Sequence, residues 1–314
     1  MNDVLLSICI PTYNRSAYLK KSIESIISQK PFIDKLVEIV ISDNSSTDDT
    51  QDVVHGFTEK HDNIYYYKNI ENVRDRNYPL SLSRAHGKLR KLSNDTLIYN
   101  KGALEYICSI VEKYDGCRPT IFLANGTLRG ISGKASIYEL PKALRKISYN
   151  VTYIGSFCVW DSDCEDIEND FDGCDLLLWQ TSKFLKMASK NSIFIDNNQL
   201  FNVQPVEKKN ISYGLFKIFH DNYLTIVSRY VASGTLSDRD YAFLEKDVIY
   251  RFLTNWAVEE ELKSKEFKFS QEENLKDILF KFCKTKSYSI NFMAHYFIKY
   301  YLRRIKRSIA NKIK

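Results

Sequence analysis

Residues 5–15 are LLSICIPTYNR and residues 37–50 are VEIVISDNSSTDDT. Each stretch begins with a run of aliphatic and β-branched residues and ends in a polar cluster. A nearly continuous apolar run of this length is typical of a parallel strand that is buried on both faces. Between the two runs, Leu19, Ile23, Ile26 and Ile27 recur at spacings of three and four, which predicts a helix capped by Ser16. The sequence therefore predicts a strand–helix–strand unit.

The two polar clusters follow the predicted strands directly. In open α/β sheets, ligands bind outside the carboxyl ends of parallel strands, where backbone groups and helix N-termini converge. Asp43 is therefore expected to accept hydrogen bonds from a ligand. Residues 45–50 either belong to the same site or serve only to cap a following helix over residues 49–60.

This order of motifs resembles the N-terminus of family 2 glycosyltransferases with the GT-A fold. It is most similar to bacterial members that build surface polysaccharides, of the abequosyltransferase type. The resemblance implies an α/β, Rossmann-like, mostly parallel sheet flanked by helices, and a nucleotide-sugar donor of the UDP, dTDP or GDP type. In that family the first loop and the Asp after the second strand hold the nucleotide, which here assigns Pro11, Thr12, Tyr13, Asn14, Arg15 and Asp43.

Residues 63–67 predict a third strand, and a polar segment follows it. Relatives commonly have an Asn-x-Gly segment lining the donor site here, and this sequence keeps Asn72 but has Arg74 where glycine is usual. The resemblance places Asn72 and Arg76 in donor binding, where an arginine would offer charge and a planar donor fork to a diphosphate. The alternative is that Arg74 and Arg76 are solvated loop cations.

The family's acidic motif falls at residues 94–96, between a predicted strand and a Gly-Ala-Leu helix start at residue 102. It is reduced here to Asn94, Asp95 and Thr96. The resemblance implies that Asn94 and Asp95 contact the donor and that Asp95 holds Mg²⁺ or Mn²⁺, although a single carboxylate binds such a cation weakly. Three alternatives follow: Asp95 still holds the metal; Lys88, Arg90 or the Arg74/Arg76 pair replaces it; or the protein is inactive.

An acidic cluster over residues 161–175 precedes a predicted apolar helix over residues 176–188. An inverting transferase needs a carboxylate near the acceptor hydroxyl as general base, and relatives place it just before a helix. By position, Asp175 and Asp172 are the catalytic candidates. The alternatives are a solvated acidic loop and, for Asp175, a role as the cap of the helix.

The remaining elements are predicted from periodicity. Residues 120–123 and 151–154 favour strands, and residues 193–195 favour the last strand of the core. Apolar spacing beyond that point predicts helices over residues 215–233, 239–256, 274–283 and 290–313. We therefore expect a GT-A glycosyltransferase domain over residues 1–205 and a helical extension over residues 206–314.

The positive charge of the chain lies at its C-terminus. The formal net charge is +6, yet the 37 residues after Asp277 contain ten Lys and Arg and no acidic residue, so the preceding chain carries −4. Residues 290–314 predict a basic amphipathic helix suited to an anionic membrane surface. Docking of this helix on the domain itself or on a partner subunit, as in a homo-oligomer, is the alternative; no motif indicates nucleic-acid binding. The apolar and aromatic stripe comprises Phe292, Met293, Tyr296, Phe297, Tyr300, Tyr301, Ile305 and Ile309, and the cations are Lys299, Arg303, Arg304, Lys306, Arg307, Lys312 and Lys314.

The cysteine content and the N-terminal sequence indicate where in the cell the protein is expected. Seven cysteines without a Cys-x-x-Cys pair indicate neither a disulfide framework nor a zinc site, and no signal peptide or membrane span is predicted. The expectation is a cytoplasmic glycosyltransferase, peripheral on the inner face of the cell membrane. It would transfer a sugar, with inversion, to a glycan or lipid-linked glycan in polysaccharide synthesis. The alternative is a catalytically silent GT-A-like scaffold or nucleotide-binding protein.

Overall fold

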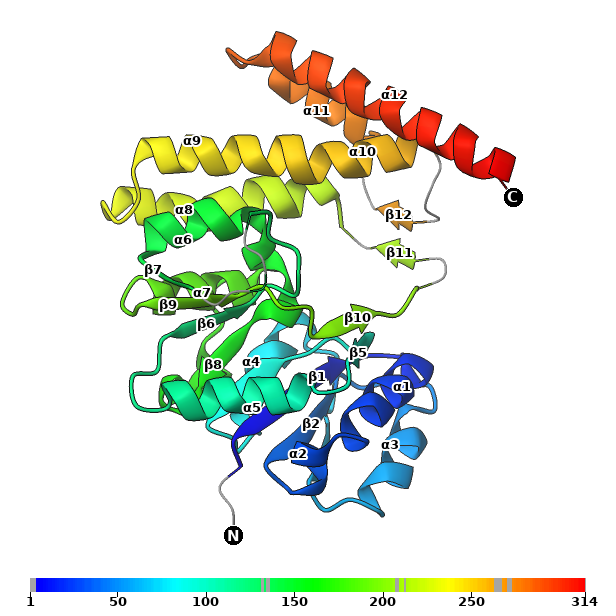
Figure 1. Ribbon diagram of the computed structural model, residues 1–314, viewed down its shortest axis with the longest axis vertical. Helices are drawn as coiled ribbons and strands as arrows, with labels where there is room; N and C mark the ends of the chain where they lie inside the picture. Colours follow the sequence, from blue (N-terminus) through cyan, green and yellow to red (C-terminus); the bar gives the residue numbers. More distant parts are fainter. Residues whose placement is uncertain are drawn as a thin grey trace. The chain divides into compact units, whose positions relative to one another are not determined.

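The computed structural model describes residues 4–130, 133, 136–206, 209–211, 213–262, 267–269 and 273–313. The chain divides into two compact units, Met1–Pro205 and Val206–Lys314. The first is an α/β unit and the second is mainly helical (Figure 1).

The first unit is built on a five-stranded sheet with the order β3-β2-β1-β4-β8. Its strands are β1 (Leu6–Thr12), β2 (Val37–Asp43), β3 (Ile64–Lys68), β4 (Leu89–Leu92) and β8 (Cys158–Trp160). The first four are mutually parallel, and β8 is antiparallel to β4. The predicted mostly parallel sheet is confirmed, including the two strands of the N-terminal unit.

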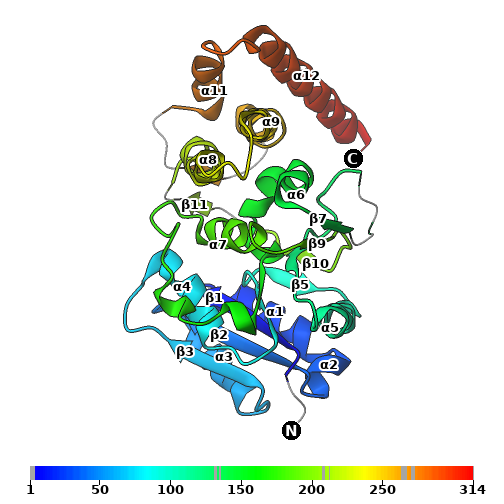
Figure 2. The same ribbon diagram turned by 90° about the vertical axis from the view of Figure 1, so that its left-hand side faces the viewer.

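Side-chain alternation along the strands separates two helical layers. Ile8, Ile10, Ile39 and Ile41 point to one face, where they form a core with α1 (Ser16–Ile27), α2 (Lys30–Ile33), α3 (Thr50–Thr58) and α5 (Ala103–Tyr114). The opposite face of β1, β2 and β4 packs against α4 (Asn77–Ser83). Both faces of the sheet are therefore covered (Figure 2), which explains why its strands lack polar alternation.

Two smaller sheets complete the unit. The first has the order β6-β9-β7, from β6 (Thr120–Leu123), β9 (Ile193–Asp196) and β7 (Ser136–Tyr138); the second pairs β5 (Leu97–Tyr99) with β10 (Phe201–Val203). The remaining helices of this unit are α6 (Leu140–Ile147) and α7 (Trp179–Ala188). Because β10 follows β9, the prediction that residues 193–195 end the core was wrong.

Other predicted elements also need correction. Residues 151–154 are not a strand: they lie in and between two 3₁₀ turns, Ser148–Thr152 and Ile154–Ser156, and α6 just before them was not predicted. Helix α7 begins at Trp179 rather than at residue 176.

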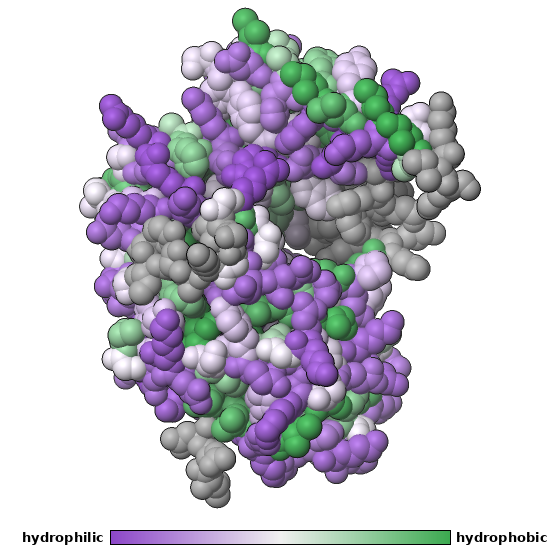
Figure 3. Space-filling view, viewed as in Figure 1, coloured by the Kyte–Doolittle hydropathy of each residue, from purple (hydrophilic) through white to green (hydrophobic). Residues whose placement is uncertain are grey.

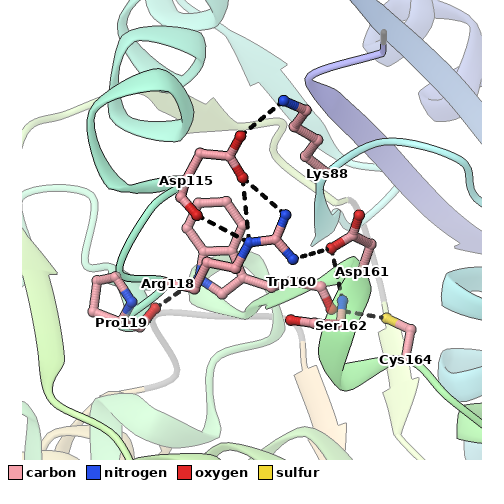
Figure 4. Close-up of polar contacts among 8 residues, drawn as sticks. All are labelled: Lys88, Asp115, Arg118, Pro119, Trp160, Asp161, Ser162 and Cys164. Atoms are coloured by element: carbon pink, nitrogen blue, oxygen red, sulfur yellow. Dashed lines mark hydrogen bonds and ion pairs between the residues drawn. The ribbon is translucent and has the colours of Figure 1, made fainter.

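An ionic network lies at the amino end of β4, away from the carboxyl ends of the strands (Figure 4). Asp115 accepts hydrogen bonds from Lys88 Nζ at 2.8 Å and from Arg118 NH2 at 2.8 Å. Arg118 NH1 also contacts Asp161 Oδ1 at 2.6 Å, and its guanidinium lies 5.5 Å from the centre of the Trp160 ring. This network joins the end of α5, the start of β4 and the end of β8.

The second unit is mainly helical, and its helices overlap the four predicted ones. Its elements are a π-helical segment (Lys217–Asn222), α8 (Tyr223–Ala232), α9 (Asp238–Asp247), a second π-helical segment (Val248–Leu253), α10 (Thr254–Glu261), α11 (Leu275–Cys283), α12 (Ser289–Ile313) and a small parallel pair, β11 (Lys209–Ile211) and β12 (Phe267–Phe269). Within the described residues, no helix is both long and apolar enough to cross a membrane.

Candidate functional site

Three predicted donor-site residues meet at the carboxyl ends of β1 and β4. Asp95 follows β4 and is 4% exposed. Its Oδ2 accepts a hydrogen bond from Thr12 Oγ1 at 3.0 Å, and its Oδ1 pairs with Arg15 NH1 at 3.0 Å. The Arg15 side chain remains 29% exposed. The buried carboxylate is therefore neutralised by a guanidinium that also reaches the surface.

The loops after β1 and β2 are tied together by hydrogen bonds. Ser46 Oγ accepts from the Asn14 backbone N–H at 2.9 Å, and Asn14 Oδ1 accepts from the Thr47 N–H at 2.8 Å. Asp48 Oδ2 accepts from the Ser16 N–H at 3.2 Å, so Asp48, not Ser16, caps α1. The polar residues that precede α3 thus hold the loop after β1 in place as well as the start of their own helix.

Asp43 holds the loop after β2 through its buried carboxylate. It is fully buried, with Oδ1 accepting from the Ser46 N–H at 2.8 Å and Oδ2 accepting from the Tyr66 hydroxyl at 2.6 Å. Burial and the Asp43 carboxylate together raise the pKa of Tyr66. Beside Asp43, Pro11 is half-buried while Tyr13 is 45% exposed. Tyr13 therefore presents its ring at this edge, whereas both Asp43 oxygens are already used by the protein.

A network of side-chain amides holds the loop after β3. Asn72 Oδ1 accepts from Asn44 Nδ2 at 2.8 Å, and Asn69 Nδ2 donates to Asn77 Oδ1 at 2.9 Å. Arg84 NH2 donates to Asn69 Oδ1 at 2.8 Å from beneath the loop. Asn72 therefore fixes the position of its own loop against β2. Asn44, Asn69 and Arg84 were not predicted from the sequence.

The segment Arg74–Arg76 lies against the acidic loop before α7. The Arg76 guanidinium lies 4.6 Å from the centre of the Phe171 ring. Asp75 Oδ2 is buried without a hydrogen-bond partner, and burial raises the pKa of Asp75 to about 7. Burial and the nearby Asp75 also raise the pKa of the Cys174 thiol to about 12. Residues about a hundred positions apart are thus brought together.

The two predicted carboxylates of the acidic loop are both exposed. Asp172 Oδ2 accepts from Ser182 Oγ on α7 at 2.6 Å. Asp175 does not cap α7, because the N-cap position belongs to Leu178 and Asp175 lies three residues before it. The cap prediction for Asp175 was therefore wrong, and its carboxylate lies on the surface.

Comparison with known proteins places most of this site in one family. Residues 7–122 match the profile of glycosyl transferase family 2. Residues 7–122 form a glycosyltransferase family 2 domain of the GT-A type. Every predicted donor-site residue lies in that range, whereas Asp172 and Asp175 lie outside it.

Curated relatives resemble this family 2 domain over part of their length. Abequosyltransferase RfbV of Salmonella typhimurium is 42% identical over 87 residues, which is 27% of this chain and 26% of the relative. The GalNAc(5)-diNAcBac-PP-undecaprenol beta-1,3-glucosyltransferase of Campylobacter jejuni is 36% identical over 101 residues, 32% of each chain. The alignments thus span about a quarter to a third of these relatives.

Solved structures share the GT-A fold over more of the chain. S. aureus TarS residues 1–349 with UDP superimposes with a TM-score of 0.57 at 16% identity, covering 81% of this chain and 74% of TarS. The TarS complex with UDP-GlcNAc gives a TM-score of 0.57 at 17% identity, covering 83% and 77%. The GT-A fold predicted from the sequence is confirmed.

The residues at the position of the family's acidic motif do not suit the metal ion that was predicted to bind Asp95. Asp95 is already paired with Arg15, and Asn94 is a half-buried neutral residue. Across the part of the chain that the structure describes, no cluster of three or more His, Cys, Asp or Glu could hold a metal ion. The donor set at Asp95 therefore lacks the carboxylates that Mg²⁺ or Mn²⁺ prefers.

Two predicted replacements for the metal also lie elsewhere. Lys88 donates to Asp115 in the ionic network at the amino end of β4. Arg90 NH1 donates to the Leu82 carbonyl at 2.8 Å, on the side of α4. The cation that does reach Asp95 is Arg15, a pairing across 80 residues of sequence.

Proposed function

We propose that this protein is a nucleotide-sugar-dependent glycosyltransferase that transfers a sugar to a glycan acceptor. The observation that carries the proposal is the Thr12–Arg15–Asp95 cluster, which lies at the carboxyl edge of the sheet in a family 2 domain. A partly exposed guanidinium at this edge suits the diphosphate of a UDP, dTDP or GDP donor. The exposed Tyr13 ring beside it suits the base or ribose.

The reaction would proceed with inversion at the anomeric carbon. An acidic-loop carboxylate removes the proton of the acceptor hydroxyl, the oxygen attacks the anomeric carbon, and the nucleoside diphosphate leaves with the bonding electrons. Both carboxylates are exposed, and Asp175 is the first candidate for the base because Asp172 already accepts a hydrogen bond from Ser182. Arg15 and Arg76 would stabilise the departing diphosphate.

Turnover of a panel of UDP-, dTDP- and GDP-sugars tests this proposal. We expect Asp175→Asn to reduce transfer by roughly 10²–10⁴-fold while nucleotide affinity is retained. Asp172→Asn serves as the comparison, with a smaller loss expected. If neither substitution slows transfer, both residues are excluded as the base. Nucleotide binding without any transfer or donor hydrolysis would instead favour the silent GT-A-like scaffold.

We further propose that the acceptor is lipid-linked and that α12 brings the protein to the inner face of the cell membrane. The name of the Campylobacter jejuni relative includes undecaprenol, which supports such an acceptor. Helix α12 offers a membrane-facing surface in Ile298, Tyr301, Leu302, Ile305 and Ile309, each 54–60% exposed. Arg304 and Lys306 are exposed on the same helix. This arrangement is typical of helices that lie on anionic membranes.

Part of the predicted apolar stripe of α12 is used within the second unit. Phe292 and Tyr296 are fully buried, and Tyr296 OH donates to Glu261 Oε2 at 2.5 Å. Arg303 pairs with Glu259, and Lys299 Nζ donates to the Tyr250 carbonyl at 2.8 Å. These residues are therefore occupied by internal packing. Lys312 and Lys314 lie outside the described side chains.

A further inference from the structure

We propose that the donor diphosphate is bound without a divalent cation, and that Arg15, positioned by Asp95, supplies the positive charge in its place. This inference rests on the proposed transferase function. In this proposal Asp95, the single carboxylate of the acidic motif, positions Arg15 and does not bind a metal.

The hydrogen-bond partners of Asp95 favour an arginine over a metal ion at this carboxylate. Both carboxylate oxygens are engaged, Oδ1 by Arg15 NH1 and Oδ2 by Thr12 Oγ1, each at 3.0 Å. The flanking Asn94 and Thr96 carry no charge. A divalent cation needs several oxygen ligands and favours carboxylates, and here it would face a guanidinium already bound to the one carboxylate. Binding a metal would require breaking that ion pair.

The same geometry leaves Arg15 able to bind an anion. A guanidinium has five N–H donors in a planar fork, and NH1 is the nitrogen that contacts Asp95. The side chain is 29% exposed although its partner is buried, so the fork reaches the surface at the carboxyl edge of β1. Two oxygens of a phosphate match such a fork. Asp95 thus fixes the orientation of Arg15 and lowers the entropic cost of binding.

Arg15 also suits the chemistry of the leaving group. The bond between the anomeric carbon and the diphosphate oxygen breaks as the acceptor oxygen bonds to that carbon, and the acceptor proton passes to Asp175 or Asp172. The electron pair of the broken bond remains on the diphosphate. A fixed guanidinium at that position stabilises the added negative charge without a metal.

Calorimetric titration of the full chain with UDP, GDP and dTDP, each in EDTA and in Mn²⁺, tests the inference. We expect one nucleotide to bind with a Kd that Mn²⁺ changes by less than about twofold. Arg15→Ala should raise this Kd by roughly tenfold or more, and Arg15→Lys, which keeps the charge but not the fork, should raise it by less. Lys21→Ala removes an exposed cation farther along α1 and should leave the Kd unchanged.

Direct Mn²⁺ titration followed by electron paramagnetic resonance gives a readout independent of turnover. We expect no stoichiometric Mn²⁺ binding in the wild-type protein, with or without the nucleotide. Tighter nucleotide binding in Mn²⁺ by about tenfold, abolished by Asp95→Asn, would overturn the inference and leave the transferase proposal standing. Metal-independent binding without transfer would support the inference and count against the transferase. Failure of all three nucleotides to bind in either buffer would overturn both.

Discussion

At the scale of single residues, the backbone of Arg74 is strained. Its φ of +52° lies in the left-handed region, at the position where the family resemblance predicts a glycine. Glycine has no Cβ to clash there, so we expect Arg74→Gly to raise the free energy of unfolding by about 1 kcal/mol in urea denaturation. Arg76 has an ordinary helical φ of −62°, so Arg76→Gly should lower stability instead. Equal effects of the two substitutions would contradict the strain at Arg74.

Asp75 makes stability depend on pH. Because burial raises its pKa to about 7 in the folded protein, the folded state binds this proton more tightly than the unfolded chain does. Stability is therefore lost as the pH rises from the unfolded carboxyl value toward 7. Asp75→Asn removes this titrating carboxyl. Between about pH 5 and about pH 8, the free energy of unfolding of the wild type should therefore fall by on the order of 2 kcal/mol more than that of the variant.

Urea denaturation at both pH values measures this difference, with Glu71→Gln as the control. Glu71 is an exposed carboxyl in the same loop, and its replacement should leave the pH dependence as in the wild type. Parallel pH profiles for wild type and Asp75→Asn would show that Asp75 stays ionised in the folded protein.

The sequence identified Thr12, Arg15 and Asp95 as candidates for a donor site but did not predict the contacts among them. Thr12, Arg15 and Asp95 were each predicted from motifs that follow strands, and the structure brings them together. The pairing of Arg15 with Asp95 spans 80 residues and depends on the placing of β4 beside β1, which a single sequence does not show. Arg84 was missed for a similar reason, because a helix arginine that supports a distant loop has no local signature.

At the scale of elements, Asp48 links two helices. Its Oδ2 accepts from the Ser16 N–H at the start of α1, and its Oδ1 accepts from the Thr50 N–H at 3.1 Å at the start of α3. Losing both contacts should lower the free energy of unfolding by about 1–2 kcal/mol in Asp48→Ala. Asp49→Ala is the matched control, because Asp49 occupies the N-cap position of α3 without a side-chain cap bond. Equal losses in urea denaturation would contradict this role.

The contribution of Asp48 should also depend on pH. Burial alone would raise the pKa of Asp48, but hydrogen bonds from Thr50 and Ser16 outweigh it and lower the pKa. A carboxyl with a lowered folded pKa stabilises the protein above its unfolded value, and this stabilisation is lost as the pH falls through the folded value. The stabilities of wild type and Asp48→Ala should therefore converge in acid.

The errors in predicted elements have a common physical origin. Residues 151–154 have the apolar, β-branched composition of a strand, yet they form 3₁₀ turns through bonds such as Tyr153 N–H to the Asn150 carbonyl at 3.0 Å. A short apolar segment can satisfy its backbone hydrogen bonds either in a strand or in 3₁₀ turns, so tertiary packing decides which of the two forms. The long runs of β1 and β2 leave no such choice, because their residues are buried on both faces.

At the scale of the whole molecule, the positive charge is concentrated in the last 37 residues. The chain before residue 278 carries a net charge of −4, and the ten cations beyond it outweigh this. Figure 3 shows hydrophobic surface along α12 among hydrophilic side chains. The buried Phe292 and Tyr296 fix one face of the helix to its own unit, and a separate face with Ile305 and Ile309 remains exposed.

This exposed face predicts binding to anionic membranes. The full chain should sediment with vesicles that contain phosphatidylglycerol, and added salt should weaken the binding because each cation near the surface contributes about 1 kcal/mol. Ile305→Glu places a charge in the apolar face and should weaken binding by roughly tenfold or more. Asn291→Glu adds the same charge at another exposed position of α12 and should weaken it much less. Equal binding by both variants would exclude this face as the membrane contact, and wild-type self-association lost only in Ile305→Glu would assign it to a second copy of the chain.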